Sequence, residues 1–321
     1  MNFLIQKKSI YIFFLALIST LVLVLIPWED LRSSAYVDRA NYVSYIDYNL
    51  NKTLWFDYDT LLSKISFEWG WHKLIFIATE HGLSSDNIFY IISSLILFFS
   101  IILVTSRHNY YSFLFLINPV FIDFCFSQMR LAFTMSLIYL AYLLFKRNNY
   151  LYIPILICTP FIHTSAIIFL GIFLIATKLE QWKNLNFLIK NTIAITFGLI
   201  LAIVTGPLIS QILGGLGDRR AEYEDMSSPV LYMSFWVIYF VYLVIKAYTE
   251  KIERNNYFYI SLIILSMVFF NTFLAGYSSR FLAACFPIII LSMLQLQSKE
   301  KNLIILGYIA YTAILWFFWT T

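Results

Sequence analysis

Residues 257–275 read YFYISLIILSMVFFNTFLA, a run of nineteen positions without a charged side chain. An α-helix rises about 1.5 Å per residue, so a helix of this length matches the roughly 30 Å hydrocarbon core of a bilayer. The run therefore predicts a membrane-spanning helix.

The whole chain is similarly apolar. Of its 321 residues, 60% are hydrophobic and 12% are charged, and the mean hydropathy is +0.76. A soluble domain carries about 25% charged residues. This chain has too few charges to cover a water-facing surface, so we expect lipid to be its solvent. The net charge of +4 then bears on orientation in the membrane and not on affinity for nucleic acid.

Apolar runs of about 17–25 residues, together with two shorter ones, predict the spans. We therefore expect an all-α fold, a polytopic integral membrane helical bundle with about eleven spans, forming a single transmembrane domain over residues 1–321. The short pair 150–162 and 164–177 is also compatible with a re-entrant hairpin. The predicted spans lie near residues 9–27, 87–104, 110–126, 129–145, 150–162, 164–177, 191–210, 230–248, 257–275, 280–296 and 302–319.

Most of the loop lysines lie in four loops, and their placement predicts the orientation of the chain. Lysine and arginine are enriched on the cytoplasmic side of membrane proteins, so the N-terminus and these loops are predicted to be cytoplasmic. The loops concerned are 146–149, 178–190, 245–256 and 298–302.

Two loops, 28–86 and 211–229, are then extracytoplasmic. Within the first, residues 65–81 read ISFEWGWHKLIFIATEH. This segment is amphipathic, and it is too short and too polar for an ordinary span. It predicts an interfacial or re-entrant helix.

The positive charges left at the outer helix ends are mostly arginines. Arg130 lies in FCFSQMRLAFTM and Arg280 in YSSRFLAACFP. An arginine near the bilayer centre costs roughly 3 kcal/mol, and its planar guanidinium suits phosphate oxygens. Both arginines are therefore candidates for binding a phosphate group. The alternative interpretation of Arg130 is a side chain that snorkels from a helix end. The alternative for Arg280 is a structural ion pair. Arg219 and Arg220 lie among acidic residues in GGLGDRRAEYEDMSSP, where local solvated pairing is as good an explanation as ligand binding.

Two candidates for a general base stand out. His163 follows Pro160 and precedes Thr164 at a predicted helix break, and a break inside a membrane is tolerated where it lines a cavity. Glu68 and His72 stand four residues apart and share one face of a helix. The alternative interpretation of His163 is a buried histidine with satisfied hydrogen bonds. The alternative for Glu68 and His72 is a surface pair on an interfacial helix.

Sugar-binding side chains are predicted in the first outer loop. Asp38 and Arg32 lie in RSSAYVDRANY, where a carboxylate can bind sugar hydroxyls. Tyr42 and Trp69 are candidates for stacking on sugar rings. Anchoring in the aromatic belt at the membrane interface explains such aromatics equally well.

Several common motifs are missing from the sequence. The four histidines show no metal-ligand spacing, and there is no Walker loop, GxGxxG or GxSxG. We therefore expect no metal, no other cofactor, no ATP site and no serine nucleophile. The energy must come from an activated bond in the substrate or from a gradient.

Five pieces of the sequence together resemble a known family. In order, they are RSSAYVDRANY, FEWGWHKL, SQMRLAF, FIHTSAIIF and YSSRFLAACFP, which contain Asp38, Glu68, Arg130, His163 and Arg280 respectively. The arrangement resembles the Wzy-type bacterial O-antigen and capsular polysaccharide polymerases, especially the EpsG-like group, and the similarity covers most of the chain.

The resemblance implies a membrane glycosyltransferase with a GT-C-like fold in the bacterial inner membrane. Its substrates would be undecaprenyl-diphosphate-linked repeat units, joined at the outer face without a metal. Arg130 and Arg280, with Arg219 or Arg220, would stabilise the departing diphosphate. His163, or the pair of Glu68 and His72, would deprotonate the acceptor hydroxyl. Membrane lipid, a chain-length regulator and a flippase would be its partners.

Three other functions fit part of the pattern. An O-antigen-ligase-like transferase differs in its acceptor, and a membrane acyltransferase would need acyl-CoA. A lipid-linked oligosaccharide flippase or another transporter tends to show repeated halves and midplane polar residues. The sequence shows no repeat, and its charges gather at one face.

Overall fold

The computed structural model describes residues 2–50, 58–215, 228–249, 254–274, 276–296 and 299–321, without the side chains of residues 2–8, 212 and 213. All regular structure in these residues is helical, as the apolar runs predict. The chain divides into two compact units. The first contains Met1–Ile117, Phe121–Phe169 and Trp319–Thr321, and the second contains Asn118–Val120 and Leu170–Phe318. The single transmembrane domain expected for residues 1–321 stays a prediction.

The first unit holds the N-terminal helices. They are α1 (Asn2–Leu25), α2 (Trp28–Leu31), α3 (Val37–Ser44), the π-helix η1 (Tyr45–Asn49), α4 (Leu61–Ser66), α5 (Trp69–Glu80), α6 (Ser85–Arg107), the 3-10 helix η3 (Tyr110–Leu116), most of α7 (Pro119–Ser127), α8 (Met129–Phe145) and α9 (Tyr152–Ile162).

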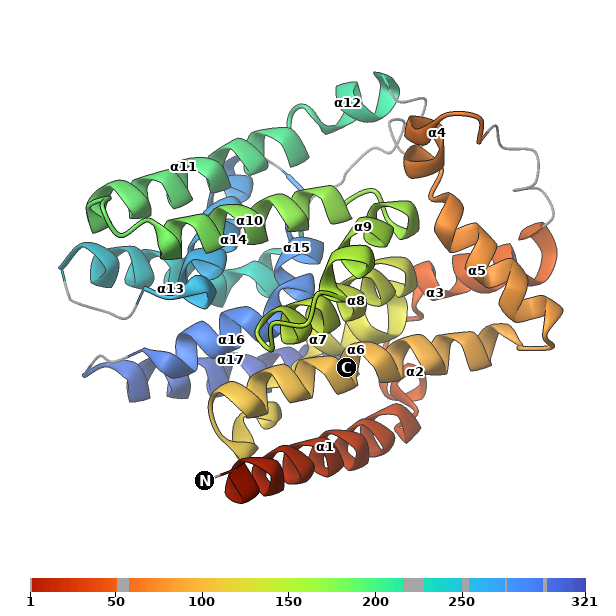
Figure 1. The fold of residues 1–321 in the computed structure, drawn as a ribbon, viewed down its shortest axis with the longest axis horizontal. Helices are drawn as coiled ribbons and strands as arrows, with labels where there is room; N and C mark the ends of the chain where they lie inside the picture. Colours follow the sequence, from red (N-terminus) through yellow and green to blue (C-terminus); the bar gives the residue numbers. More distant parts are fainter. Residues whose placement is uncertain (1, 51–57, 216–227, 250–253, 275, 297–298) are drawn as a thin grey trace. The chain divides into compact units, whose positions relative to one another are not determined.

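A chain of neighbouring helices forms the core of this unit. Helix α1 packs along α6, α6 along α8, and α8 along α9, while α4 and α5 pack on α9 (Figure 1). Most buried positions of α6 and α8 are aliphatic or small, and Phe89, Tyr139 and Tyr142 are the aromatic exceptions. Segments distant in the sequence, α5 and α9, thereby become neighbours.

The predicted helix at 65–81 is two helices in the structure. Helix α4 ends at Ser66 and α5 begins at Trp69, and Glu68 between them adopts a left-handed backbone with φ 53°. A non-glycine residue in this conformation costs about 1–2 kcal/mol, so contacts elsewhere must stabilise the break. Those contacts belong to the Glu68 carboxylate.

The second unit holds the C-terminal helices. They are most of α10 (Ala166–Gln181), then α11 (Phe187–Thr205), α12 (Ile209–Gly215), α13 (Val230–Thr249), α14 (Asn256–Leu274), α15 (Ser279–Ala284), α16 (Phe286–Gln295) and most of α17 (Lys301–Thr320).

Helix α14, which contains the run 257–275, is the centre of the second unit. It packs against α11, α13, α15 and α16 and is buried along most of its length. The approach of α11 is close, since a Cβ on Gly198 would lie 2.5 Å from the carbonyl oxygen of Ile263. A helix that is apolar all round is typically buried on all sides, as here.

Five of the described helices, α6, α11, α13, α14 and α17, are long and apolar enough to cross a membrane. The pair η3 and α7, bent by 77°, makes a sixth if it counts as one span. Helices occupy all eleven predicted runs, yet the predicted count of about eleven spans is not confirmed. Several of these helices are apolar but shorter than the helices that qualify as spans. They are α8, α9, α16 and the Ser9–Leu25 part of α1. The protein is a multi-pass membrane protein.

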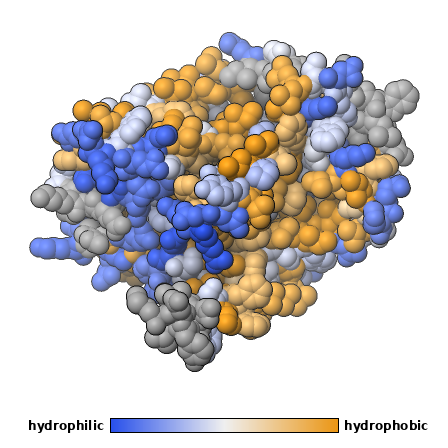
Figure 2. Space-filling view, viewed as in Figure 1, coloured by the Kyte–Doolittle hydropathy of each residue, from blue (hydrophilic) through white to orange (hydrophobic). Residues whose placement is uncertain are grey.

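Hydrophobic side chains reach the surface in the way that lipid contact requires. Along α1, Phe14, Ile18 and Val22 are exposed, and along α17, Leu303 and Phe317 are exposed. Orange, hydrophobic atoms occupy much of the face seen in Figure 2. In water such a surface would be unfavourable, whereas lipid tails cover it without penalty.

Candidate functional site

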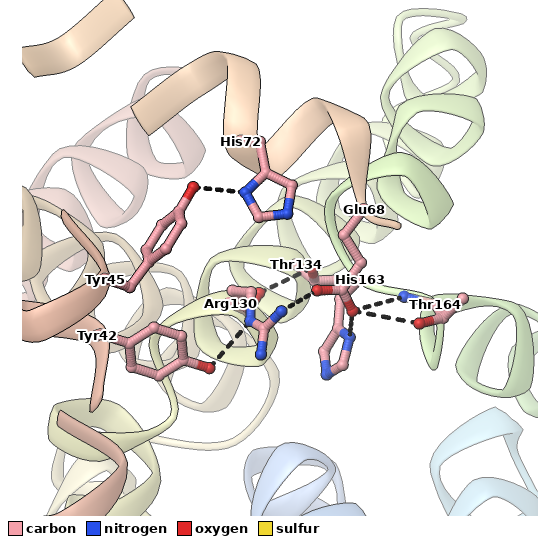
Figure 3. A network of polar contacts seen from close by, with 8 residues as sticks. All are labelled: Tyr42, Tyr45, Glu68, His72, Arg130, Thr134, His163 and Thr164. Atoms are coloured by element: carbon pink, nitrogen blue, oxygen red, sulfur yellow. Dashed lines mark hydrogen bonds and ion pairs between the residues drawn. The ribbon is translucent and has the colours of Figure 1, made fainter. Parts of the chain in front are cut away.

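The buried carboxylate of Glu68 is the centre of a polar network in the first unit (Figure 3). Glu68 is 2% exposed and stands directly before α5. Its backbone carbonyl accepts hydrogen bonds from the amides of Trp71 at 3.0 Å and His72 at 3.3 Å. Because these bonds start α5, the Glu68 backbone is fixed to that helix.

Arg130 supplies the charge that opposes Glu68. It lies in the first turn of α8, and its Nη1 donates to Oε2 of Glu68. Its Nε donates to Oη of Tyr42 at 3.1 Å, and the guanidinium lies 5.3 Å from the centre of the Tyr42 ring. A buried carboxylate without an opposite charge is strongly unfavourable, so Arg130 explains how Glu68 is tolerated here.

His163 approaches the other carboxylate oxygen. It follows the end of α9 in an extended conformation, and its Nδ1 lies 2.5 Å from Oε1 of Glu68. Thr164 adds two donors to the same oxygen, its Oγ1 at 3.2 Å and its backbone amide at 3.4 Å. Pro160 occupies the last turn of α9, which is consistent with the predicted break.

The contact with Glu68 decides the tautomer of His163. An ionised carboxylate only accepts hydrogen bonds, so Nδ1 must carry the proton that it donates. A neutral imidazole then has its lone pair on Nε2. In Figure 3 this second nitrogen points away from Glu68. The arrangement resembles the carboxylate and histidine pairs that act as general bases.

His72, one turn further along α5, has a different partner. Its Nδ1 bonds to Oη of Tyr45, and the two rings are T-shaped at 5.3 Å. Burial, followed by the charge of Arg130, lowers the pKa of His72 from 6.5 to about 4, although Glu68 and the Phe67 backbone oppose this shift. The imidazole is therefore neutral at pH 7.

The four predicted glycan-binding residues lie in two places. Tyr42 holds Arg130, and Asp38 lies one turn before Tyr42 on the same face of α3. Trp69 begins α5, is 39% exposed and meets Phe161 edge to face at 6.5 Å. These three residues lie on the elements that carry the network.

The contacts of Arg32 lead to another carboxylate. Its Nε lies 3.7 Å from Oδ1 of Asp123, and its guanidinium lies 4.7 Å from the Tyr36 ring centre. Asp123 also accepts a hydrogen bond from Nε1 of Trp319 at 2.8 Å. This cluster ties the end of α2 to the end of α17, so Arg32 has a structural partner there.

Arg280 belongs to the second unit. Its Nε donates to Oη of Tyr277 at 3.0 Å, and its guanidinium lies 4.9 Å from that ring centre. Arg130 and Tyr42 show the same combination of bond and ring contact. Arg219 and Arg220 lie outside the described residues. The predicted convergence of these arginines with Arg130 stays a prediction.

Two relationships in the structure differ from what the sequence predicts. Glu68 is expected to pair with His72, whereas its carboxylate binds Arg130 and His163, which are 62 and 95 positions away. No local pattern encodes contacts at such separations. Asp123 was also missed, although a lone carboxylate within a predicted span, 110–126, is a usable signal.

Among the described residues, no group of three or more histidine, cysteine, aspartate or glutamate side chains is placed to hold a metal ion. Metal independence itself stays a prediction.

Comparison with known proteins gives one family. The model of the EpsG family matches residues 11–321, nearly the whole chain. No curated protein and no solved structure matches the chain.

Proposed function

The chain belongs to the EpsG family, and from this membership and the geometry around Glu68 we propose that it is a polysaccharide polymerase acting on lipid-linked substrates. It joins undecaprenyl-diphosphate-linked oligosaccharide repeat units by glycosyl transfer. The observation that carries the proposal is the bridge formed by Glu68, whose two carboxylate oxygens bind Arg130 and His163.

The reaction replaces one bond at the anomeric carbon. The bond from that carbon to the diphosphate oxygen of the donor breaks, and the electron pair leaves with the diphosphate. A hydroxyl oxygen of the acceptor forms the new glycosidic bond, and its proton must go to a base. The donor is already activated, so the protein has to stabilise the leaving charge and accept one proton.

His163 is the proposed base. With Nδ1 committed to Glu68, its Nε2 can accept the hydroxyl proton, and the carboxylate stabilises the imidazolium that forms. His72 is less suited to this role, because a pKa of about 4 makes it a weak base at neutral pH.

Arg130 is proposed to bind the diphosphate. Its Nε and Nη1 bind Tyr42 and Glu68, and among the described residues Nη2 has no hydrogen-bond partner. The Arg130 side chain is 26% exposed, so Nη2 is placed to contact a ligand. Charge-assisted bonds from guanidinium to phosphate are among the stronger hydrogen bonds in proteins.

Arg130 cannot carry the diphosphate charge alone, since Glu68 already offsets one positive charge. We therefore propose that Arg280, with Arg219 or Arg220, supplies the remaining positive charge. Arg280 is held by Tyr277 in the manner in which Tyr42 holds Arg130. Asp38, Tyr42 and Trp69 are proposed to contact the glycan, and Arg32 is proposed only on the basis of its sequence position.

The proposed sidedness of the protein rests on the positions of its lysines. We propose about eleven membrane passages, a cytoplasmic N-terminus and a site at the extracytoplasmic face of a bacterial inner membrane, with a GT-C-like arrangement. A flippase would supply substrate to that face, and a chain-length regulator would end polymerisation. These points rest on loop charge and family resemblance.

The test is reconstitution. Purified protein in nanodiscs is incubated with a lipid-diphosphate-linked repeat unit, and products are separated as a ladder on a gel. The expected result is a ladder with one-repeat spacing that needs no acyl-CoA and no ATP. Transport of the lipid-linked unit without a ladder would instead favour a flippase. Transfer only to a different acceptor would favour a ligase.

A further inference from the structure

Gly70 lies where α5 meets α9, and it packs directly on the backbone of the neighbouring helix. A Cβ at position 70 would lie 3.0 Å from the carbonyl oxygen of Phe161, 3.1 Å from its Cβ and 3.2 Å from its carbonyl carbon. Contacts this short require a shift of a few tenths of an ångström. Two of the three atoms are backbone, so the shift falls on the helices themselves.

The contact between Gly70 and Phe161 lies close in the sequence to both Glu68 and His163. Gly70 follows Glu68 by two positions, and Phe161 precedes His163 by two. Glu68 is fixed to α5 by the bonds from its carbonyl to the Trp71 and His72 amides. His163 is fixed to α9 by its amide, which donates to the Thr159 carbonyl at 3.1 Å. A displacement between the two helices therefore passes directly to the pair.

The Glu68 side chain has little freedom to absorb such a displacement. Arg130, on α8, binds Oε2, while His163 and Thr164 bind Oε1. The carboxylate cannot follow His163 without moving away from Arg130. The close approach at Gly70 is thus a geometric condition for both contacts.

We infer that Gly70 is a positioning residue for the base. The absence of a Cβ lets α5 approach Phe161 closely enough for Glu68 to hold His163 in the Nδ1-protonated tautomer. As a role in turnover, the inference rests on the proposed glycosyl transfer. The placement of His163 itself can be measured without any turnover.

The experiment compares Gly70→Ala with Gly171→Ala. Gly171 is also in a helix, and a Cβ there would meet nothing within 4 Å, so it is a matched control. Both variants and the wild type are labelled with ¹⁵N-histidine in nanodiscs, and the His163 ring signals are assigned with His163→Gln. Turnover of lipid-linked repeat units is measured on the same samples.

The wild type and Gly171→Ala are expected to show His163 with its proton on Nδ1. Gly70→Ala is expected to show a mixture of tautomers and a kcat lower by about tenfold, with KM for the donor unchanged, since small misplacements of reacting groups reduce rates steeply. A purely structural role would not change the tautomer of His163.

Two results would overturn the inference. One is an unchanged tautomer and kcat in Gly70→Ala. The other is loss of the folded protein in that variant, because a shift of a few tenths of an ångström should be absorbed locally. If the wild type makes no polymer while the tautomer of Gly70→Ala still changes, the polymerase function fails and the positioning role stands.

Discussion

Oε1 of Glu68 lies 2.5 Å from Nδ1 of His163, although 95 positions separate the two residues in the sequence. The His163 side chain is 12% exposed and that of Glu68 is 3% exposed, so this contact is shielded from water. At low local dielectric the carboxylate stabilises an imidazolium more strongly than it would at a surface. The proposed base, His163, is therefore held by a buried carboxylate that favours its protonated form.

Replacing Glu68 by Gln removes the charge but keeps the size of the side chain. We expect kcat to fall by about 10²–10⁴-fold, because an amide can neither fix the tautomer of His163 nor stabilise the imidazolium. The measurement is the initial rate of ladder formation with purified protein. Glu80→Gln, at the exposed end of the same helix, is the matched control and should behave as the wild type. Equal rates in both variants would exclude an electrostatic role of Glu68.

Replacing His163 by Ala removes the proposed proton acceptor. We expect turnover to fall by about 10²–10⁴-fold and to be partly restored by added imidazole, which can enter the vacated space. His81→Ala is the control, since His81 is exposed and its Nδ1 bonds to the Ile77 carbonyl of its own helix. The assignment of the base is wrong if His163→Ala and Glu68→Ala both keep full turnover.

The sequence predicted much of the helical structure for a physical reason. Lipid requires long apolar runs with internally bonded backbones, so the runs at 87–104 and 129–145 correspond closely to α6 (Ser85–Arg107) and α8 (Met129–Phe145). Arg130, His163 and Glu68 were each singled out, because charged or titratable groups in apolar surroundings are conspicuous. The identity of the candidates was thus accessible from composition and local pattern.

The contacts among Glu68, Arg130 and His163 could not be predicted from the sequence. The predicted helix at 65–81 breaks at Glu68, not at Gly70, the residue with the greatest backbone freedom. The break depends on contacts of Glu68 with Arg130 and His163, which only the tertiary structure creates. Local propensity favoured one continuous helix, and the buried carboxylate overrode it.

Arg130 is best tested by a change that keeps its charge. Arg130→Ala would leave the buried Glu68 carboxylate uncompensated, which is destabilising by about 3–5 kcal/mol. Arg130→Lys keeps the charge but loses the planar fork and the Nε bond to Tyr42. We expect Arg130→Lys to raise KM for the lipid diphosphate donor about tenfold or more.

Arg280→Lys should also raise the KM for the lipid diphosphate donor, because Arg280 is proposed to bind the diphosphate together with Arg130. Arg147→Lys, in an exposed turn after α8, is the control and should leave KM unchanged. We further expect Arg130→Ala and Arg280→Ala to abolish polymer while the protein still inserts in the membrane. Normal long-chain product from both alanine variants would remove the diphosphate role.

The pKa of His72 predicts a specific effect of acid on stability. In the folded protein this pKa is lowered to about 4, mainly by burial and then by Arg130, whereas in an unfolded chain it takes its ordinary value of 6.5. Between these values the unfolded chain binds the extra proton, so the free energy of unfolding falls as the pH drops from 6.5 towards 4. His72→Gln removes this contribution. The thermal midpoint in detergent should therefore fall less between pH 7 and pH 4.5 in His72→Gln than in the wild type.

His81→Gln, at an exposed position, should keep the wild-type slope. Only the slopes are compared, because His72→Gln also loses the bond to Tyr45 at every pH. Parallel slopes in His72→Gln and the wild type would mean that His72 is not buried as a neutral imidazole. It would then compete again with His163 for the role of base.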